Sequence, residues 1–282
     1  KYINQSDFDL VHLHWIGGEM LSISDFKHIN KPMIWTLHDM WAFCGAEHVS
    51  FDERWRAGYN ITNRPEHESG FDLNRWTWER KNKHWDHPFQ IVTPSRWLGQ
   101  SVRESALMAN WPIRVIPNCL DTEMWKPMDR NIARELLNLP KDIPLLLFGA
   151  NGAGASSSFH KGFDLLLSAL KYLEGRIDDL ELVIFGQHKP RELPDLGFPI
   201  RYVGYLYDDL SLRALYSAVN ALVIPSRRDN LPNTGLEAQA CGTPVIAFNI
   251  DGLKDIVLHK ETGYLANPFC VNDLADGVDW TL

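Results

Sequence analysis

The stretch from Ala221 to Phe248 constrains the fold of this 282-residue chain more than any other. Its first apolar run, Ala221 to Ile224, ends at a proline and is typical of a buried parallel strand. A polar loop follows, and then Thr234 with Glu237 three residues later forms the pattern of a capping box. Gly242 indicates the end of that helix, and a second apolar run closes the stretch. The order of strand, loop, helix and strand predicts a βαβ unit.

The loop of this unit is suited to an anion that lies beside hydroxyl groups. It follows the carboxyl end of a strand, where open α/β sheets bind ligands. Free amides at the start of the next helix favour an anion such as a diphosphate. Two acids, Asp229 and Glu237, flank this position. Carboxylates accept strong hydrogen bonds, so the pair favours a ligand with sugar hydroxyls.

Other runs of apolar residues predict the remaining elements. Period-two or continuous apolar patterns predict strands, and Ser95 is a candidate helix cap. The predicted strands cover residues 8–15, 33–37, 89–94, 114–118, 145–149, 182–185, 200–203 and 263–265, and the predicted helices cover 74–85, 95–108, 163–173 and 210–219.

The residues around the two acids resemble the donor-binding signature of retaining glycosyltransferases with the GT-B fold. The signature is an acid, seven residues and then Glu-Ala, followed here by Cys-Gly-Thr-Pro-Val. The closest group is family four, the group 1 enzymes of bacterial polysaccharide synthesis. Asp229 departs from the wider family, where a Glu is frequent at this position. The resemblance runs from about Asp9 to Gly277 and is strongest over residues 36–41, 114–121, 161–173 and 225–246.

The resemblance implies an α/β protein of GT-B architecture, with two Rossmann-like domains that face a cleft. Residues 1–116 would form the acceptor-side domain and residues 117–282 the nucleotide-sugar domain, because the segment Val115 to Asp121 resembles the family's hinge. Relatives have further residues before the first strand, so the first domain is expected to be incomplete.

The implied reaction moves a hexosyl unit from a nucleotide-sugar to a saccharide or lipid-linked acceptor, with retention of anomeric configuration. No metal or other cofactor is expected, since basic residues and helix dipoles stabilise the leaving diphosphate in such enzymes. A truncated fragment that binds nucleotide-sugar without catalysis is an alternative, and a GT-B sugar epimerase is a second.

The resemblance also assigns site residues. His38, in the segment Thr36 to Trp41, and Asp229 would lie beside the transferred sugar as catalytic residues. Lys161 would bind the diphosphate and Glu237 the ribose. The other implied donor-binding residues are Gly186, Gly204, Asn230, Leu231, Asn233 and Thr234. From the residues alone, His38 could equally be a structural histidine of its loop, and His12 with His14 could be a metal pair, although packing is favoured.

Composition and charge limit the other classes of function. A net charge of −8 argues against a general nucleic-acid binder. Four cysteines without CxxC spacing favour free thiols in a reducing cytoplasm. No apolar run is long enough for a membrane span. The segment Asn74 to Trp85 mixes tryptophans with basic residues. This pattern predicts a peripheral contact with the inner face of a membrane, a site that grips a phosphate-bearing acceptor, or a packed helix with a solvated basic side.

Overall fold

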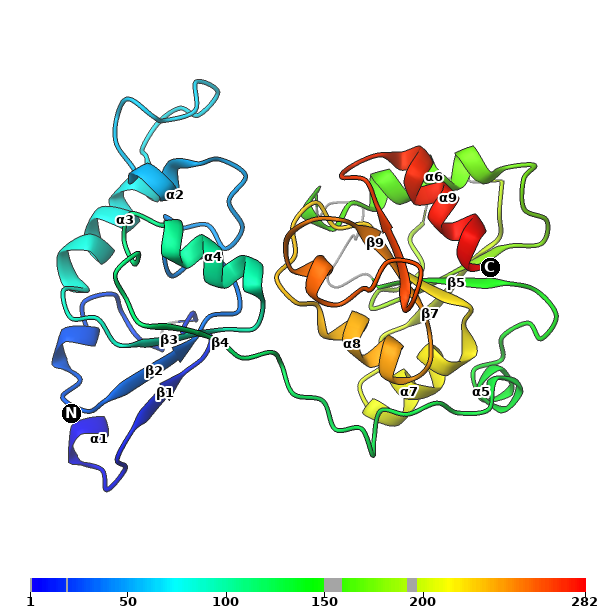
Figure 1. Ribbon diagram of the computed structural model, residues 1–282, viewed down its shortest axis with the longest axis horizontal. Helices are drawn as coiled ribbons and strands as arrows, with labels where there is room; N and C mark the ends of the chain where they lie inside the picture. Colours follow the sequence, from blue (N-terminus) through cyan, green and yellow to red (C-terminus); the bar gives the residue numbers. More distant parts are fainter. Residues whose placement is uncertain (1, 19, 150–158, 192–196) are drawn as a thin grey trace. The chain divides into compact units, whose positions relative to one another are not determined.

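The computed structural model of the protein describes residues 2–18, 20–149, 159–191 and 197–282. The chain divides into two compact units, Lys1–Pro117 and Asn118–Leu282. Each unit has its own parallel sheet with helices beside it (Figure 1).

The first unit is built on a four-stranded sheet in the order β1-β2-β3-β4. Every neighbouring pair is parallel, so the strands all end at the same edge of the sheet. The strands are β1 Val11–Leu13, β2 Met33–Thr36, β3 Gln90–Thr93 and β4 Ile113–Val115. The helices are α1 Tyr2–Gln5, α2 Arg54–Ala57, α3 Leu73–His84 and α4 Arg96–Glu104, with a 3₁₀ turn η1 at Phe26–His28.

Aromatic side chains fill the core of the first unit, and a buried lysine ties this core to the loop after β2. Lys81 of α3 is fully buried. Its Nζ donates hydrogen bonds to the carbonyl oxygens of Trp41, Cys44 and Gly45. The ammonium also lies 3.8 Å from the ring centroid of Trp41. Burial lowers the pKa of Lys81 to about 7, while the three carbonyl oxygens use all three N–H donors of the charged form.

The second unit contains a six-stranded parallel sheet in the order β10-β9-β8-β5-β6-β7. The chain runs outward from β5 to β7 and then returns to the other side of β5 with β8. This places a topological switch point between β5 and β8, where open α/β sheets bind ligands. The strands are β5 Leu145–Gly149, β6 Glu181–Phe185, β7 Ile200–Gly204, β8 Ala221–Ile224, β9 Val245–Phe248 and β10 Gly263–Ala266.

Helices cover both faces of this larger sheet. Figure 1 shows α6 and α9 on one face and α7 and α8 on the other. The helices are α5 Arg130–Leu136, α6 Phe163–Leu173, α7 Asp209–Ala218, α8 Asn233–Ala240 and α9 Val271–Thr281, with 3₁₀ turns η3 Phe159–Lys161 and η4 Asp251–Asp255. Because both faces are covered, the central strands read as continuous apolar runs, and β5, β8 and β9 are buried along almost their whole length.

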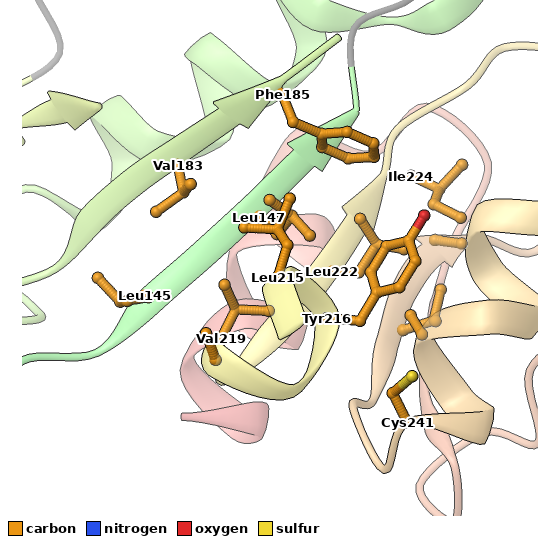
Figure 2. Packing of buried hydrophobic residues seen from close by; sticks show 14 of the residues in the cluster. Leu145, Leu147, Val183, Phe185, Leu215, Tyr216, Val219, Leu222, Ile224 and Cys241 are labelled. Carbon is orange, nitrogen blue, oxygen red and sulfur yellow. The ribbon is translucent and has the colours of Figure 1, made fainter. Parts of the chain in front are cut away.

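Alternate residues of β5 belong to two separate cores. Leu145 and Leu147 pack with α7, while Leu146 and Phe148 pack with α6 and α9. Figure 2 shows the first of these cores, in which Tyr216 of α7 lies among the strand residues. Its phenol is the polar end of an otherwise apolar cluster.

The structure confirms most predicted elements and corrects one helix start. The strands at 145–149, 221–224 and 245–248 have the predicted bounds, and the Ser95 hydroxyl accepts from the Leu98 amide as a helix cap. The predicted capping box of Thr234 and Glu237 is wrong. Helix α8 begins earlier, with Pro232 at the cap position and without a side-chain cap. The Gly235 amide donates to the carbonyl of Pro232, three residues before it, so the first turn is closed by an i→i+3 bond and not by the usual i→i+4 bond.

Several other bounds differ from the predictions, most of them by one or two residues, and two elements are clearly shorter than predicted. The first strand is limited to Val11–Leu13 within the predicted range 8–15. Helix α4 ends at Glu104, because Ser105 adopts an extended conformation and its hydroxyl donates to the Val102 carbonyl. A hydroxyl that competes for backbone partners in this way is a common reason for a helix to end.

Candidate functional site

A pocket lies at the switch point of the second unit. Its volume is about 40 Å³, and it is lined by the ends of β5 and β8, the loop after β8 and the start of α8. The polar side chains that line it are Lys161, Ser226, Asp229 and Thr234. Three of the site residues predicted from the sequence, Lys161, Asp229 and Thr234, are therefore brought together, although Lys161 lies 68 positions before Asp229.

An ion pair forms the centre of this pocket. Lys161 Nζ lies 2.9 Å from Asp229 Oδ2, and the Ser226 hydroxyl donates to the same oxygen over 3.0 Å. The Asp229 side chain is only 12% exposed, whereas Lys161 is 35% exposed. The site thus offers one ammonium for an anion and one oriented carboxylate for hydroxyl donors. The sequence did not single out Ser226, although it lies within the loop that carried the prediction.

Backbone contacts fix the two partners of this ion pair. Gly162, directly after Lys161, has φ +67°, and a Cβ at this position would lie 1.9 Å from the carbonyl oxygen of Pro225. Only glycine permits such a close approach. The Arg227 amide donates to the His160 carbonyl over 2.7 Å, and the Asp229 carbonyl accepts from the Gly252 amide over 3.1 Å.

A salt bridge also attaches the loop after β8 to helix α6. The Arg227 guanidinium donates to both carboxylate oxygens of Asp164 in α6, at 2.7 and 2.6 Å. The same guanidinium lies 4.0 Å from the ring centroid of Phe159. The loop after β8 is therefore joined to the start of α6. His160 adds no positive charge here at neutral pH, because burial and then the charge of Lys161 lower its pKa.

Glu237 lies one helical turn after Thr234 and is held by the core. Its Oε2 accepts a hydrogen bond of 2.9 Å from the Tyr216 hydroxyl. Burial raises the pKa of Glu237, and the Tyr216 hydrogen bond offsets part of this rise. Sequence patterns gave no signal for Tyr216, because it occupies an apolar position of α7 (Figure 2).

The other predicted donor-binding residues offer fewer groups to a ligand. The Asn233 side-chain oxygen accepts from Asn118 Nδ2 over 2.7 Å. Leu231 packs its side chain into the core, so its backbone is what remains for a ligand. Asn230 is half-buried in the loop. Gly186 directly follows β6 and Gly204 is the last residue of β7, with φ +82° and +75°. The Gly186 amide donates to the Gly204 carbonyl over 2.8 Å.

A second pocket, of about 110 Å³, lies in the first unit where β1 and β2 end. His38, the predicted catalytic residue, lines it, and its Nε2 forms a hydrogen bond of 3.0 Å with His14 Nδ1. Burial and then the charge of His14 lower the pKa of His38, so the imidazole is neutral at pH 7. His12 bonds to the Thr36 hydroxyl over 2.8 Å. In the described part of the chain, no three His, Cys, Asp or Glu side chains form a group that could hold a metal ion.

The same pocket contains a pair of residues that the sequence did not predict. His48 Nδ1 donates to Asp39 Oδ2 over 2.6 Å, and Asp39 Oδ1 accepts from the Trp41 amide over 2.9 Å. The residues are nine positions apart in a loop without periodicity, so their contact depends on how that loop folds. Both belong to the pocket lining together with Trp15.

Helix α3 differs in part from the predicted aromatic and basic face. Trp76 is 44% exposed, and the Arg80 guanidinium lies 4.6 Å from the centroid of its ring. Lys81, expected on a solvated basic side or at a membrane, is instead buried. Among the helices within the described ranges, none is both long and apolar enough to cross a membrane.

Comparison with known proteins identifies the family. The family model "Glycosyl transferases group 1" matches residues 151–282, and the model "Glycosyltransferase Family 4" matches residues 1–124. Two units with parallel sheets define a GT-B protein of the α/β class. The chain belongs to the group 1, family 4 glycosyltransferases.

Individual relatives show how far the similarity extends. A D-inositol 3-phosphate glycosyltransferase of Xylanimonas cellulosilytica is 32% identical over 201 residues, which are 63% of this chain and 46% of that protein. The chain spans about half the length of the curated relatives it matches.

Solved structures share the fold. Sucrose-phosphate synthase of Thermosynechococcus elongatus superposes with a TM-score of 0.70 at 23% identity, over 99% of this chain and 65% of that one. HepE of Anabaena, in complex with UDP-glucose, gives 0.67 at 16% identity over 96% and 68%.

Proposed function

We propose that this protein transfers a hexosyl unit from a nucleotide-sugar to a saccharide or lipid-linked acceptor, with retention of anomeric configuration. The observation that carries the proposal is the group of Lys161, Ser226 and Asp229 at the switch point of the second sheet. A cation and a carboxylate at one ligand-binding position match the two chemical parts of a nucleotide-sugar, its diphosphate and its hydroxyl-bearing rings.

Each side chain then has a role that follows from its surroundings. Lys161 and the amides of Asn233 and Thr234 at the start of α8 bind the diphosphate and stabilise the charge that develops when it leaves. A diphosphate at Lys161 replaces Asp229 as the partner of the ammonium, which leaves the Asp229 carboxylate to accept from sugar hydroxyls. Glu237 accepts from the ribose hydroxyls, and Tyr216 holds it in place.

For His38 we keep the role that the family resemblance implies, a contact with the transferred sugar. Its lowered pKa supports a neutral imidazole, which can donate one hydrogen bond and accept another. For Gly186 and Gly204 we keep backbone contacts with the base. The Gly186 amide and the Gly204 carbonyl bond to each other, so these two groups already have a partner.

A donor-binding experiment tests the proposal. Isothermal titration with UDP-, GDP- and ADP-sugars should show binding of one nucleotide class, and the UDP-glucose complex of HepE makes the UDP-sugars the first choice. The Glu237→Ala variant should weaken this binding by about 1.5–3 kcal/mol, the contribution of a charged hydrogen bond. The exposed Glu261 provides a matched control, Glu261→Ala, that should bind normally.

Equal affinity of the Glu237→Ala variant and the original protein would contradict the ribose role.

Nuclear magnetic resonance of the product formed with an acceptor would then test transfer and anomeric retention. Free nucleotide and an altered sugar, formed without an acceptor, would contradict the transferase proposal and favour an epimerase.

We further propose a cytoplasmic location with a peripheral contact at the inner face of a membrane. The exposed rings of Phe71 and Trp76, 6.2 Å apart, and the Arg80 guanidinium above Trp76 support this contact. Sedimentation with vesicles that contain anionic lipid should remove the protein from solution, and the double variant Trp76→Ala/Arg80→Ala should remain in the supernatant. Equal sedimentation of both proteins would contradict the contact.

A further inference from the structure

The pocket of the first unit presents an indole ring that is placed for stacking. Trp15 follows β1 and is 54% exposed. Its ring lies against the backbone of Gly17, where an added Cβ would be 2.3 Å from the ring, and next to Gly18, which has φ +64°. Because neither glycine has a side chain, one side of the indole can lie against their backbone. The ring is therefore positioned by the backbone while much of its surface stays accessible.

The Asp39–His48 pair supplies hydrogen-bonding groups beside this ring. The Trp15 and His48 rings lie 6.3 Å apart, and the Trp41 and His48 rings are stacked at 6.4 Å. Because Asp39 accepts from Nδ1 of His48, Nε2 is the ring nitrogen that remains to bond with a ligand hydroxyl. An apolar plane next to a ring nitrogen and a carboxylate suits a pyranose ring, which has apolar C–H faces and hydroxyl edges.

The charge of the lining residues narrows the ligand further. Among the described residues that line this pocket, none is Lys or Arg, and Asp39 carries a negative charge. The neighbouring His38 is neutral at pH 7. A phosphate group in this pocket would lie near the Asp39 carboxylate. The ammonium of Lys81, which lies against the Trp41 ring, already uses its three N–H donors on carbonyl oxygens, and this disfavours a phosphorylated ligand.

We propose that the Trp15 pocket binds an uncharged saccharide ring of the acceptor, which stacks on the indole of Trp15 and bonds through its hydroxyls to His48 and Asp39. This inference rests on the proposed glycosyl transfer and specifies its acceptor as a neutral sugar. It distinguishes the protein from its relatives named D-inositol 3-phosphate glycosyltransferases, whose name gives a phosphorylated acceptor.

Binding of matched sugars tests the proposal. Saturation-transfer nuclear magnetic resonance would compare glucose, mannose and galactose with their 6-phosphates, each with and without the bound donor. The neutral sugars should bind more tightly than their phosphates. Trp15→Ala should weaken neutral-sugar binding about tenfold, which corresponds to the loss of about 1.4 kcal/mol of stacking. Trp15→Phe should retain affinity within about threefold, because an aromatic plane remains.

Two controls separate this proposal from the function on which it rests. Trp280, an exposed tryptophan of α9, gives the matched variant Trp280→Ala, which should bind sugar normally. Glu237→Ala should weaken donor binding and keep sugar binding in the absence of donor. If donor binding fails in the original protein while sugar binding depends on Trp15, the proposed function is wrong and the pocket assignment holds.

Three results would overturn the pocket assignment. The first is tighter binding of the sugar phosphates than of the neutral sugars. The second is equal affinity of Trp15→Ala and the original protein for neutral sugars. The third is the absence of neutral-sugar binding both with and without the donor.

Discussion

The two pockets occupy the same position in their sheets and have opposite chemistry. Each lies where parallel strands end, the first after β1 and β2 and the second after β5 and β8. The second contains the Lys161–Asp229 ion pair, whereas the first contains tryptophans, histidines and one carboxylate. The architecture thus determines where a ligand binds, and the few residues that follow each strand determine which ligand it is.

The pockets also differ in what holds them. In the second unit, backbone contacts and the Arg227–Asp164 pair hold the loop at the surface of the sheet. In the first unit, the ammonium of Lys81 bonds to three carbonyl oxygens under the loop after β2. A single buried side chain has a larger effect when removed than one of several attachments, and the predictions below test this difference.

The largest effect is expected for Lys81→Ala. The substitution leaves a cavity and three carbonyl oxygens without their donor, so we expect the free energy of unfolding to fall by about 3 kcal/mol or more. Urea denaturation followed by tryptophan fluorescence measures this change. Lys83→Ala, an exposed neighbour on the same helix, should change stability by less than about 0.5 kcal/mol. Donor binding by the folded protein should persist, because the Lys81 contacts lie within the first unit.

The second prediction concerns Lys161, in the second pocket. Lys161→Ala removes the cation of the second pocket, and we expect the affinity for the nucleoside diphosphate to fall by about 1.5–3 kcal/mol. Sugar binding at Trp15 should be unchanged. Calorimetric titration measures the first effect and ligand-observed magnetic resonance the second. Lys171→Ala, an exposed lysine of α6, is the matched control. Loss of both binding activities in Lys161→Ala would contradict the independence of the two pockets.

The third prediction concerns pH. Burial raises the pKa of Glu237, so its carboxyl group binds a proton at a higher pH than an ordinary glutamic acid. A protonated carboxyl accepts hydroxyl hydrogen bonds weakly, and donor affinity should therefore fall as the pH decreases through the raised pKa of Glu237. The contribution of Glu237 to the free energy of unfolding changes with pH in the opposite direction to donor affinity. The folded state holds this proton more tightly than the unfolded chain, so this contribution decreases as the pH rises through the raised pKa.

The Glu237→Gln variant separates the Glu237 effect from other titrations. It should bind donor more weakly at pH 8 and lose most of the pH dependence. Calorimetric titrations at several pH values would show this. An unchanged pH profile in the variant would assign the dependence to another group.

The second pocket could be predicted from the sequence largely because most of its determinants are local. The strand at Ala221–Ile224 and the acid at 229 follow from a short run of residues, and parallel strands bring Lys161 to the same edge. The contacts made by Tyr216 and Lys81 could not be predicted, since an apolar helix position and a basic helix face give no indication of a distant polar partner. The prediction of a helix cap at Thr234 was wrong because Pro232, with φ −64°, starts the helix earlier.

The smallest effect is expected for Asp164→Ala, which removes the salt bridge between α6 and the loop after β8. Asp164 is 62% exposed, and exposed pairs contribute less than about 1 kcal/mol, so stability should change within that limit. Donor affinity should stay within about twofold, because the Arg227 amide still bonds to His160 and Gly162 still contacts Pro225. Gly162→Ala should instead lose donor binding, since its Cβ requires the Pro225 backbone to move. Thermal unfolding and donor titration of both variants would measure these differences. A loss of donor affinity in Asp164→Ala as large as that in Gly162→Ala would show that the second pocket, like the first, depends on a single side chain.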